Sequence, residues 1–455
     1  MQTSVDQMDS EDLRAVLQGD DAAAQAFLHL LPHPADIADA LSEVDAEEWP
    51  RLLHLISDEE ARAEVVSLLD EHEQLAEYLR PEDIGSLLRQ MESDDAADLL
   101  AELAPDEQKE ALEALPEEER REVLALLQYP EDSAGGIMQA ERVEVQGKAT
   151  VDEAISQIRD MVDEGIDVHK IFVIDEKERL VGMVELVDLL LHAGARKLSD
   201  LMTPPVATAH PLLDQEEVVG LFRKYDLVVL PVVDGEGRLL GRIVHDDVVD
   251  VLDEEAEEDV LRMAGTDAEE LLYRDRALAV ARVRMPWLLV NLFGSLVSGW
   301  LLHLYEPVIA QAILIASFIP VITAMGGNVG TQSATILTRG FATGRLDLGD
   351  VPRLVFKEFR VGLLMGLLCG GGVSLIATFL FADGRYHLGL VVWVAMVAAM
   401  TTAAVVGTLA PAVMKRFGID PAIASGPFVT TANDIIGIVL YMSTAVAFLD
   451  KLTGA

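Results

Sequence analysis

The chain contains 455 residues, 51% of them hydrophobic, and carries a formal net charge of −44. Its length exceeds that of one compact domain, and its charge argues against nucleic acid as a partner, because phosphates would be repelled. The acidic excess is uneven: residues 1–275 hold 70 Asp and Glu against 22 Lys and Arg, whereas residues 276–455 hold 8 against 12. We therefore expect an acidic soluble half, suited to metal cations, followed by a hydrophobic half.

The N-terminal sequence MQTSVDQMDSEDLRAVLQGDD lacks the basic stretch and the apolar stretch of a signal peptide. The one cysteine, Cys369, lies in an apolar run, so disulfides are not expected to play a part. Both features predict that the soluble half is cytoplasmic.

Residues 1–130 are predicted to form an acidic, all-α superhelical domain. Segments such as HPADIADALSEV and PDEQKEALEALPEEERREVLALL repeat Leu and Ala at intervals of three and four, and Pro-Glu or Asp-Glu pairs mark helix starts. This pattern is typical of stacked helical repeats. Most of the carboxylates are expected to be solvated, but the group Asp94, Asp95 and Asp98 is denser than a solvated face requires.

Residues 131–250 contain an internal repeat. The stretch KIFVIDEKERLVGMVELVDLL (170–190) is echoed by VLPVVDGEGRLLGRIVHDDVV (229–249), so that Asp175 matches Asp234 and Gly182 matches Gly241. Each copy predicts strand, turn, strand and helix. The repeat resembles a tandem pair of cystathionine-synthase-type (CBS) regulatory modules, which are α+β, with copies at about 138–198 and 199–250.

CBS modules pair face to face and often bind adenosine nucleotides, so the resemblance raises ATP as a ligand. The nucleotide pattern Gly-x-x-Thr/Ser-x-x-Asp is half kept here. Asp188 and Asp247 are present, whereas Glu185 and Val244 replace the hydroxyl residues. This departure leaves nucleotide binding in doubt.

Residues 276–455 are predicted to form an all-α transmembrane domain. The five candidate spans cover residues 286–305, 308–327, 359–382, 388–414 and 422–449. Lys and Arg concentrate in the loops on the side of the soluble half, which places the N-terminus in the cytoplasm and the C-terminus outside the cell membrane. Gly362, Gly366 and Gly370 lie at four-residue spacing and predict close helix packing.

Three motifs link these parts: YPEDSAGGIM (129–138), MGGNVGTQSATILTRGFATG (325–344) and DPAIASGPFVTTANDIIG (420–437). Together with the domain order, they resemble the MgtE family of magnesium transporters over essentially the whole chain. The resemblance implies a homodimer, a cytosolic magnesium sensor and a five-helix pore domain with its ion path along the subunit interface. It also implies that the connector, residues 251–275, is a plug helix that closes the cytoplasmic mouth.

Asp434 is the one formally charged residue in the last span. An aspartate near the centre of a helix costs about 2.5–3.5 kcal/mol to insert, so it is expected to face water or a cation. Two copies across a dimer axis would attract a divalent ion, and Mg²⁺ would be held through its waters. The resemblance assigns Asp434 as the pore metal site. The alternative, a structural partner of a basic residue, lacks a Lys or Arg in the centre of any span.

Other polar residues are candidates to line the same ion path. Asn328 follows Gly326 and Gly327, where the helix is expected to break and expose its carbonyl groups. Asn433, Thr430 and Thr431 either bind the ion's waters or form hydrogen bonds between helices. Asp420 either gathers cations at the cytoplasmic entrance or caps its helix. Family members often carry an acidic residue in place of Gln311, and some carry Asn in place of Gly426; both departures bear on ion selectivity.

The predicted sensor consists of carboxylates whose mutual repulsion opens the gate and whose bridging by Mg²⁺ closes it. Its candidate residues are Asp94, Asp95, Asp98, Asp226, Asp247, Asp250, Glu254, Glu255, Glu257, Glu258 and Asp259. The resulting hypothesis is a Mg²⁺-selective, channel-like transporter gated by cytosolic Mg²⁺, with no enzyme motif. Mn²⁺ or Co²⁺ as the transported ion, and a membrane-anchored regulator that senses nucleotides, are the alternatives.

Overall fold

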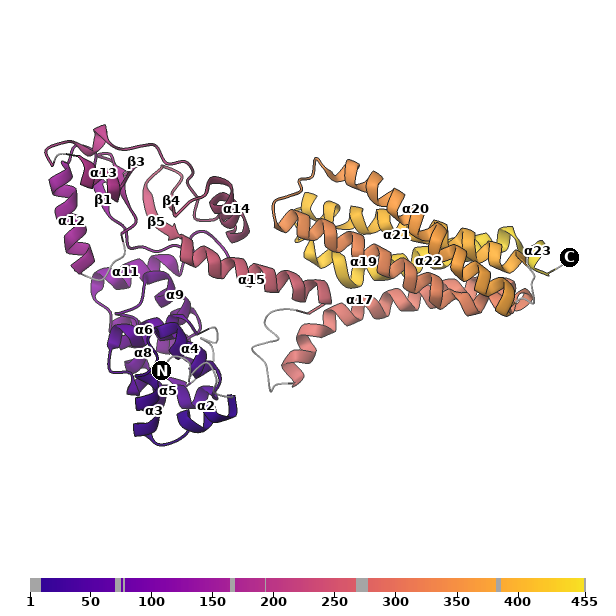
Figure 1. Ribbon diagram of the computed structural model, residues 1–455, viewed down its shortest axis with the longest axis horizontal. Helices are drawn as coiled ribbons and strands as arrows, with labels where there is room; N and C mark the ends of the chain where they lie inside the picture. Colours follow the sequence, from indigo (N-terminus) through magenta and orange to yellow (C-terminus); the bar gives the residue numbers. More distant parts are fainter. Residues whose placement is uncertain are drawn as a thin grey trace. The chain divides into compact units, whose positions relative to one another are not determined.

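A computed structural model describes residues 10–69, 75–76, 78–163, 168–192, 194–266, 277–381 and 386–453. The chain divides into two compact units, residues 1–252 and 253–455 (Figure 1). Each unit is described by itself below.

The N-terminal part of the first unit is helical, as predicted. Its helices are α2 (Ser10–Leu17), α3 (Asp21–Leu28), α4 (Pro34–Ser42), η1 (Ala46–Glu48), α5 (Trp49–Leu55), α6 (Glu59–Ser67), α8 (Pro81–Leu87), α9 (Ser93–Ala101), α10 (Pro105–Glu113) and α11 (Glu117–Leu126). Proline occupies the first turn of α4, α8 and α10, where its missing N–H has no helical partner to lose. The Leu and Ala repeats form a continuous apolar core along these helices.

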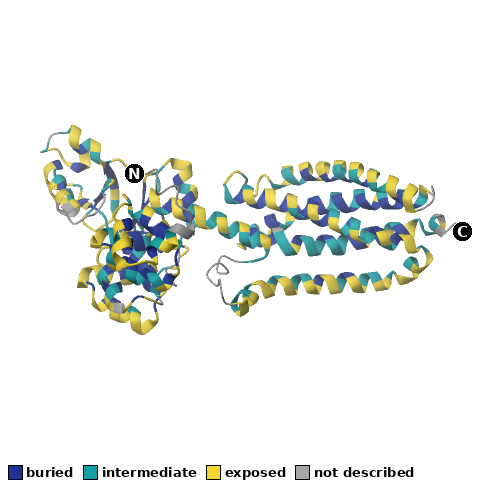
Figure 2. Cartoon of the chain, turned by 60° about the horizontal axis from the view of Figure 1, so that its bottom comes forward, coloured by how far each residue is buried: buried dark blue, intermediate teal, exposed yellow. Residues whose placement is uncertain are grey.

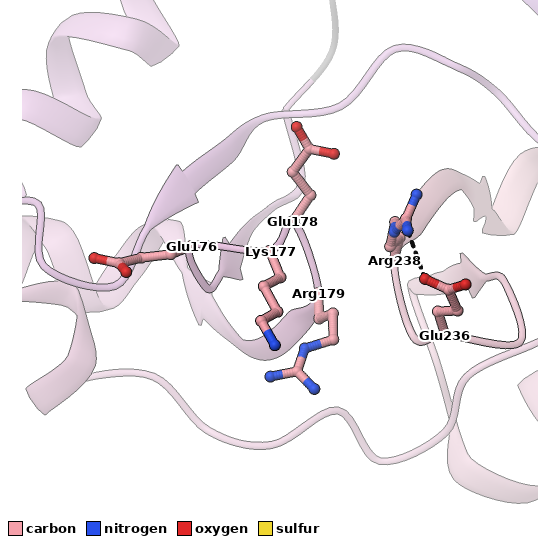
Figure 3. Close-up of a pocket in the computed structure, with 6 residues that line it drawn as sticks. All are labelled: Glu176, Lys177, Glu178, Arg179, Glu236 and Arg238. Atoms are coloured by element: carbon pink, nitrogen blue, oxygen red, sulfur yellow. Dashed lines mark hydrogen bonds and ion pairs between the residues drawn. The ribbon is translucent and has the colours of Figure 1, made fainter.

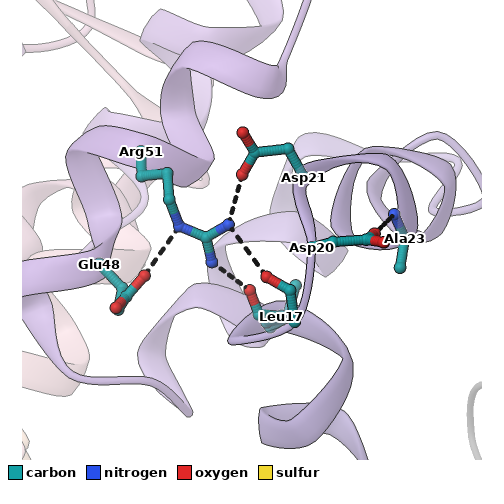
Figure 4. A network of polar contacts seen from close by, with 7 residues as sticks. Leu17, Asp20, Asp21, Ala23, Glu48 and Arg51 are labelled. Carbon is teal, nitrogen blue, oxygen red and sulfur yellow. Dashed lines mark hydrogen bonds and ion pairs between the residues drawn. The ribbon is translucent and has the colours of Figure 1, made fainter.

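Arg51 joins three of these helices (Figure 4). Its Nη1 donates to Oδ1 of Asp21 at 2.7 Å, its Nε to Oε2 of Glu48 at 2.8 Å, and its Nη2 to the Leu17 carbonyl at 2.5 Å. The planar guanidinium can satisfy all three acceptors at once, which a lysine could not do. Beside this network, Asp20 caps α3 by accepting from the Ala23 amide.

The CBS pair contains two β-hairpins with the same register. Strands β2 (Lys170–Ile174) and β3 (Leu180–Glu185) are antiparallel, as are β4 (Val229–Val233) and β5 (Leu239–Val244). Both pairs shift register between the last two residues of the first strand. The short strand β1 (Glu144–Gln146) runs parallel to β2. The remaining elements are α12 (Val151–Asp163), α13 (Leu186–Leu191), η2 (Leu198–Asp200) and α14 (Gln215–Tyr225). The repeat predicted from the sequence is therefore confirmed.

The matched aspartates form the hairpin turns. Asp175 accepts from the amides of Lys177 and Arg179, and Asp234 does the same for the residues at the equivalent positions. A hollow lies between the two turns, lined by Glu176, Lys177, Glu178, Arg179, Glu236 and Arg238 (Figure 3). None of the predicted magnesium or nucleotide residues lines it.

Helix α15 (His245–Ala264) follows β5 without a break. It begins inside the predicted second CBS copy, six residues before the predicted connector at 251–275. Residues 267–275 of that connector lie outside the described residues. The connector is therefore a direct extension of the CBS fold and not a separate element that starts after it.

Among the described residues of the second unit, five helices are long and apolar enough to cross a membrane, which confirms the predicted number of spans. They cover Ala277–Leu304, Ile313–Ala342, Val351–Phe381, Tyr386–Arg416 and Gly426–Ala447. The described elements of this unit after α15 are α17 (Ala277–Leu304), α18 (Glu306–Gln311), η3 (Ile313–Phe318), α19 (Ile319–Ala342), α20 (Val351–Ile376), η4 (Ala377–Phe381), α21 (Tyr386–Arg416), η5 (Ala424–Phe428), α22 (Val429–Ala447) and α23 (Leu449–Thr453).

Helix α21 forms the centre of this unit. Half of the most apolar 18-residue stretch of α21 is buried, whereas only 11% of the corresponding stretch of α17 is buried. Helix α17 therefore lies at the periphery. Figure 2 shows exposed residues along the outer faces of the long helices. For a membrane domain, such faces are the surfaces available to lipid or to another subunit.

The predicted helix break at Gly326, Gly327 and Asn328 is wrong. Helix α19 continues through all three residues, and both glycines are buried. Glycines at membrane depth here allow neighbouring helices to approach closely, and the helical hydrogen bonds remain intact. Irregular backbone occurs instead in η3 and in η5, where Gly426 has φ −92° and ψ −115°.

The glycine stripe of α20 packs against α21, as predicted. A Cβ atom on Gly362 would lie 2.9 Å from Cβ of Ala404, and one on Gly366 would lie 2.7 Å from Cα of Val397. The two backbones are therefore too close for a side chain at these positions.

Gly366→Ala is expected to lower the midpoint of heat-induced unfolding of the full-length protein in detergent, at a cost of about 1–3 kcal/mol from overpacking. Gly372→Ala is the matched control, because nothing lies within 4 Å of a Cβ at this position of the same helix. Size-exclusion chromatography after heating measures both midpoints. Equal midpoints would contradict the close contact between α20 and α21.

Candidate functional site

Asp434 lies in α22, well inside the span Gly426–Ala447. Its side chain is partly exposed, and within the described part of the chain it forms no hydrogen bond or ion pair. The alternative of a basic structural partner therefore finds no support among these residues. A carboxylate in this position is stable only beside water, a cation or another polar surface.

The threonines one turn before Asp434 bind other helices. Oγ1 of Thr431 donates to Oδ1 of Asn291 on α17 at 2.9 Å, and Oγ1 of Thr430 lies 3.5 Å from Oγ1 of Thr331 on α19. Of the two interpretations given to these threonines, hydrogen bonding between helices is the one observed. They hold α17 and α19 against the segment that carries Asp434.

Asn433 is buried, with 3% of its surface exposed, at the crossing of α22 with α19. A Cβ atom on Gly330 would lie 1.8 Å from its Nδ2, so the amide rests directly on the α19 backbone. Neither its nitrogen nor its oxygen has a hydrogen-bond partner among the described residues. Asn433 therefore faces the helix junction, whereas Asp434, the next residue, remains accessible.

The other candidates lie elsewhere on the second unit. Asn328 is exposed on the surface of α19. Gln311 is the last residue of the short helix α18 and precedes the second long apolar helix. Asn291 was missed, although a single Asn within the apolar run PWLLVNLFG is itself a signal of a polar contact between membrane helices.

In the first unit, α9 is bound to the first residues of the CBS pair. The Ser93 amide and Oγ donate to the two carboxylate oxygens of Glu141, at 3.0 and 2.6 Å, and Oγ accepts from the Ala140 amide. These contacts place Asp94, the next residue of α9, in the interior, where 6% of its surface is exposed.

Gln139 connects this site to the start of α15. Its Nε2 lies 2.7 Å from Oε2 of Glu92 and 3.4 Å from Oδ1 of Asp247, and its Oε1 accepts from the buried Arg242. The Val244 amide donates to the other oxygen of Asp247. The carboxylate cluster, as we call it below, consists of Glu92, Asp94, Asp95, Glu141, Asp246 and Asp247.

Burial and mutual repulsion raise the pKa values in the carboxylate cluster. Burial raises the pKa of Asp94 well above its usual value, and Asp247 raises it further. Burial followed by repulsion from Asp246 raises the pKa of Asp247 to about 8. Burial, and then Asp95, raise the pKa of Glu92 to about 7. Each shift means that the ionised form is destabilised, which a bound cation would relieve.

The donor set of the carboxylate cluster suits a hydrated cation. Oδ1 of Asp94 is buried without a hydrogen-bond partner among the described residues, so it is available to an ion or its water. No three His, Cys, Asp or Glu side chains of the described chain are arranged to ligate a bare metal ion. Mg²⁺ keeps several of its waters when it binds to proteins, so carboxylates can hold it by contacting those waters instead of the ion itself.

The remaining predicted sensor residues lie outside the carboxylate cluster. Asp98 is exposed on α9, and Asp226 ends α14 in the left-handed region with φ 54°. Asp250, Glu254 and Glu257 are exposed along α15, and Glu255 is half-buried there. Asp188, the nucleotide candidate in the first CBS copy, lies in α13, whereas its counterpart Asp247 belongs to the carboxylate cluster.

The end of α15 forms ion pairs within the second unit. Nη1 of Arg262 lies 2.7 Å from Oδ2 of Asp420, and Glu258 also pairs with Arg262. Asp259 lies 3.7 Å from Nη1 of Arg339 on α19, and burial followed by Asp420 raises its pKa to about 6. These five residues are the α15 terminal cluster. Asp420 also accepts from the Ala422 amide, so it caps the next helix, as one interpretation predicted.

Gly426 permits this approach of α15. A Cβ atom on Gly426 would lie 2.5 Å from the Met263 carbonyl oxygen. An asparagine at this position would collide with the end of α15 in the observed arrangement.

The comparisons with known proteins cover each part of the chain. Family models match at residues 319–444 (MgtE, divalent cation transporter), 32–132 (MgtE intracellular N domain), and 134–194 and 198–254 (CBS domain). The magnesium transporter MgtE of Thermus thermophilus is 39% identical over 331 residues, 72% of each chain. The chain belongs to the MgtE family.

Other MgtE proteins are similar over comparable lengths. The magnesium transporter MgtE of Bacillus subtilis is 33% identical over 327 residues, which again covers 72% of each chain. A crystal structure of the cytosolic domain of the Mg²⁺ channel MgtE in complex with ATP is 35% identical. It covers 53% of this chain and 99% of that structure, with a TM-score of 0.49.

In this MgtE protein, metal-free α9 should become less protected as the pH rises. The folded pKa values of Asp94 and Asp247 are raised, so their contribution to stability is complete below about pH 4 and is lost as the pH rises toward about 8. Amide protection factors of α9 in the full-length protein, measured by hydrogen exchange, are expected to fall by at least about tenfold between pH 6 and 8, because each group with a folded pKa near 8 costs up to about 1.4 kcal/mol per pH unit in this range. Millimolar Mg²⁺ should restore them.

Asp94→Asn is the control for this pH dependence. Without metal, the variant should lose less protection between pH 6 and 8 than the parent protein, because one of the two buried charges is absent while Asp247 still titrates. Protection that is independent of pH in the metal-free parent protein would show that these carboxylates do not oppose each other.

Proposed function

We propose that this chain is a homodimeric Mg²⁺ transporter of the cell membrane that conducts the ion like a channel and is closed by cytosolic Mg²⁺. The observation that carries the proposal is Asp434, a carboxylate inside a membrane span without a basic partner among the described residues. Membership of the MgtE family supports the same ion, because its curated relatives are named magnesium transporters.

A dimer axis next to α22 would place two copies of Asp434 opposite each other. The two carboxylates would attract a divalent cation, and contact through its waters would keep binding weak enough for release. The threonine contacts to α17 and α19 fix the helix segment just before Asp434 and so fix the position of the carboxylate.

The proposed arrangement assigns residues 1–130 and 131–250 to the sensor, residues 251–275 to the plug and residues 276–455 to the pore. The N-terminus is cytoplasmic and the C-terminus is outside, because basic residues concentrate at the helix ends that face the soluble half. Examples are Arg339 in the last turn of α19, Arg353 at the start of α20 and Lys415 in the last turn of α21.

Gating uses both ends of α15. At its start, Mg²⁺ between Asp94 and Asp247 would remove the repulsion that opposes docking of α9. At its end, the ion pairs of Arg262 with Asp420 and of Asp259 with Arg339 hold the helix against the second unit. Loss of cytosolic Mg²⁺ would restore the repulsion between Asp94 and Asp247 at the start of α15. It would also favour release of the end of α15 from its ion pairs. A shift of a few kcal/mol is enough to change which state predominates.

Asp434→Asn is expected to reduce Mg²⁺ uptake into proteoliposomes to background, because an amide offers no charge to the ion. Glu306→Gln is the matched control, since Glu306 is an exposed carboxylate outside the long apolar helices of the same unit. A dye inside the vesicles reports uptake. Full uptake by a folded Asp434→Asn dimer would remove the pore assignment.

The same assay separates the competing functions. Preference for Mn²⁺ or Co²⁺ over Mg²⁺ in competition would assign another divalent substrate. The absence of uptake of any divalent ion by the unmodified protein would favour the membrane-anchored regulator.

Neutralising five carboxylates of α15 should abolish inhibition by Mg²⁺ applied to the cytoplasmic side. The substitutions are Asp to Asn or Glu to Gln at Asp247, Asp250, Glu255, Glu258 and Asp259. The variant loses Asp247 as a ligand, the repulsion among the carboxylates of α15, and the pairs of Glu258 with Arg262 and of Asp259 with Arg339. Both the closing contacts and the opening repulsion are therefore removed, and loss of response is the expected result. Uptake as a function of Mg²⁺ on the cytoplasmic side measures it.

A control variant with the same change of charge carries neutral amides at Asp106, Glu107, Glu110, Glu113 and Glu118, which are exposed on α10 and α11. It should retain the parent response. If the α15 variant also retains it, the sensor does not use α15.

A further inference from the structure

Helix α20 carries three basic residues on one face. Arg353, Lys357 and Arg360 follow one another at intervals of four and three residues, which places them in one stripe about 10 Å long. All three are exposed. They are three of the 12 Lys and Arg residues in residues 276–455.

The same stripe continues as an apolar surface. Leu364, Leu368 and Leu375 lie on this face of α20 and are 57%, 68% and 61% exposed. The opposite face carries the glycines that pack against α21. One face of α20 is thus free along its length, basic over its first turns and apolar beyond them.

Within the described residues of the second unit, one of the three basic residues of the stripe pairs with a carboxylate. Arg353 and Arg360 form no ion pair within the described residues. Nζ of Lys357 lies 3.4 Å from Oε1 of Glu358, which is buried. The other oxygen of Glu358 accepts from Ser333 on α19 at 3.0 Å, so the stripe is linked to the packing of α19.

We propose that Arg353, Lys357 and Arg360 bind the headgroup phosphate of an anionic phospholipid whose acyl chains lie along Leu364, Leu368 and Leu375. The order of charges and apolar residues along the face matches the order of headgroup and acyl chain in one leaflet. The start of α20 lies at the membrane boundary, where long basic side chains reach the headgroup layer. On the proposed orientation, this is the cytoplasmic leaflet, which carries anionic lipids.

The test compares lipid retention by full-length variants. Arg353→Gln, Lys357→Gln and Arg360→Gln are combined in one protein, which is purified with equal amounts of phosphatidylglycerol and phosphatidylcholine and examined by native mass spectrometry. Each Lys or Arg near an anionic surface contributes about fivefold in affinity, so the triple variant is expected to bind phosphatidylglycerol on the order of a hundredfold more weakly. Phosphatidylcholine retention should not change.

Two further variants control for charge and folding. Lys109→Gln, Arg120→Gln and Arg121→Gln remove the same charge from α10 and α11 and should leave retention unchanged. Arg353→Lys with Arg360→Lys keeps the charge and should retain phosphatidylglycerol within a few fold. If the triple variant does not fold, the single Gln variants provide the same test. Each is expected to bind phosphatidylglycerol about fivefold more weakly than the parent protein.

Two results would overturn the proposal. One is equal phosphatidylglycerol retention by the triple variant and by the α10–α11 control. The other is complete displacement of the lipid by millimolar inorganic phosphate, which would identify a site for soluble anions. The test measures lipid and not transport, so its outcome is independent of the proposed function.

Discussion

A carboxylate enclosed by other carboxylates or by hydrocarbon is unfavourable unless a cation lies beside it. This constraint applies at the carboxylate cluster, where Asp94 and Asp247 are brought together, and again at Asp434 in the fifth long helix. At the carboxylate cluster, Oδ1 of Asp94 is buried without a hydrogen-bond partner among the described residues, and Asp434 forms no hydrogen bond or ion pair among them. The α15 terminal cluster differs, because Arg262 and Arg339 pair with its carboxylates. An external cation would therefore stabilise the first two sites more than the third.

Features that depend on local periodicity could be predicted from the sequence. The two CBS hairpins were expected from an offset of 59 residues, and they show that offset in register and in the position of the bulge. The five spans follow from hydropathy, but their limits were less accurate. The first four helices extend beyond the predicted limits at one end or at both, because helical order does not end at the hydrocarbon boundary, whereas the fifth, Gly426–Ala447, is shorter than predicted. The break at Gly326 and Gly327 was wrong because glycine has two uses in membrane helices, and only the neighbouring helices decide between them.

Features that depend on tertiary contact could not be predicted. Glu92, Gln139 and Glu141 belong to the same site as Asp94 and Asp247, yet they come from segments separated by up to about 150 residues. Their individual neighbourhoods in the sequence resemble any other solvated acidic turn. In the same way, the Arg262–Asp420 pair joins residues 158 positions apart, and nothing in either segment indicates the other. Asp420 was expected either to cap a helix or to attract cations; it caps a helix and pairs with an arginine.

Because α15 is one continuous helix, the number of its residues fixes how its two ends are oriented relative to each other. Asp247 in its first turn and Arg262 in its last are fifteen residues apart, about 22 Å along a single helix. Each residue added to or removed from the helix rotates one end by about 100° relative to the other. Evolution can therefore replace most exposed side chains of α15 with little effect, but it cannot readily change the number of residues between these two ends. The length of this helix is expected to vary far less among functional descendants of the chain than its composition.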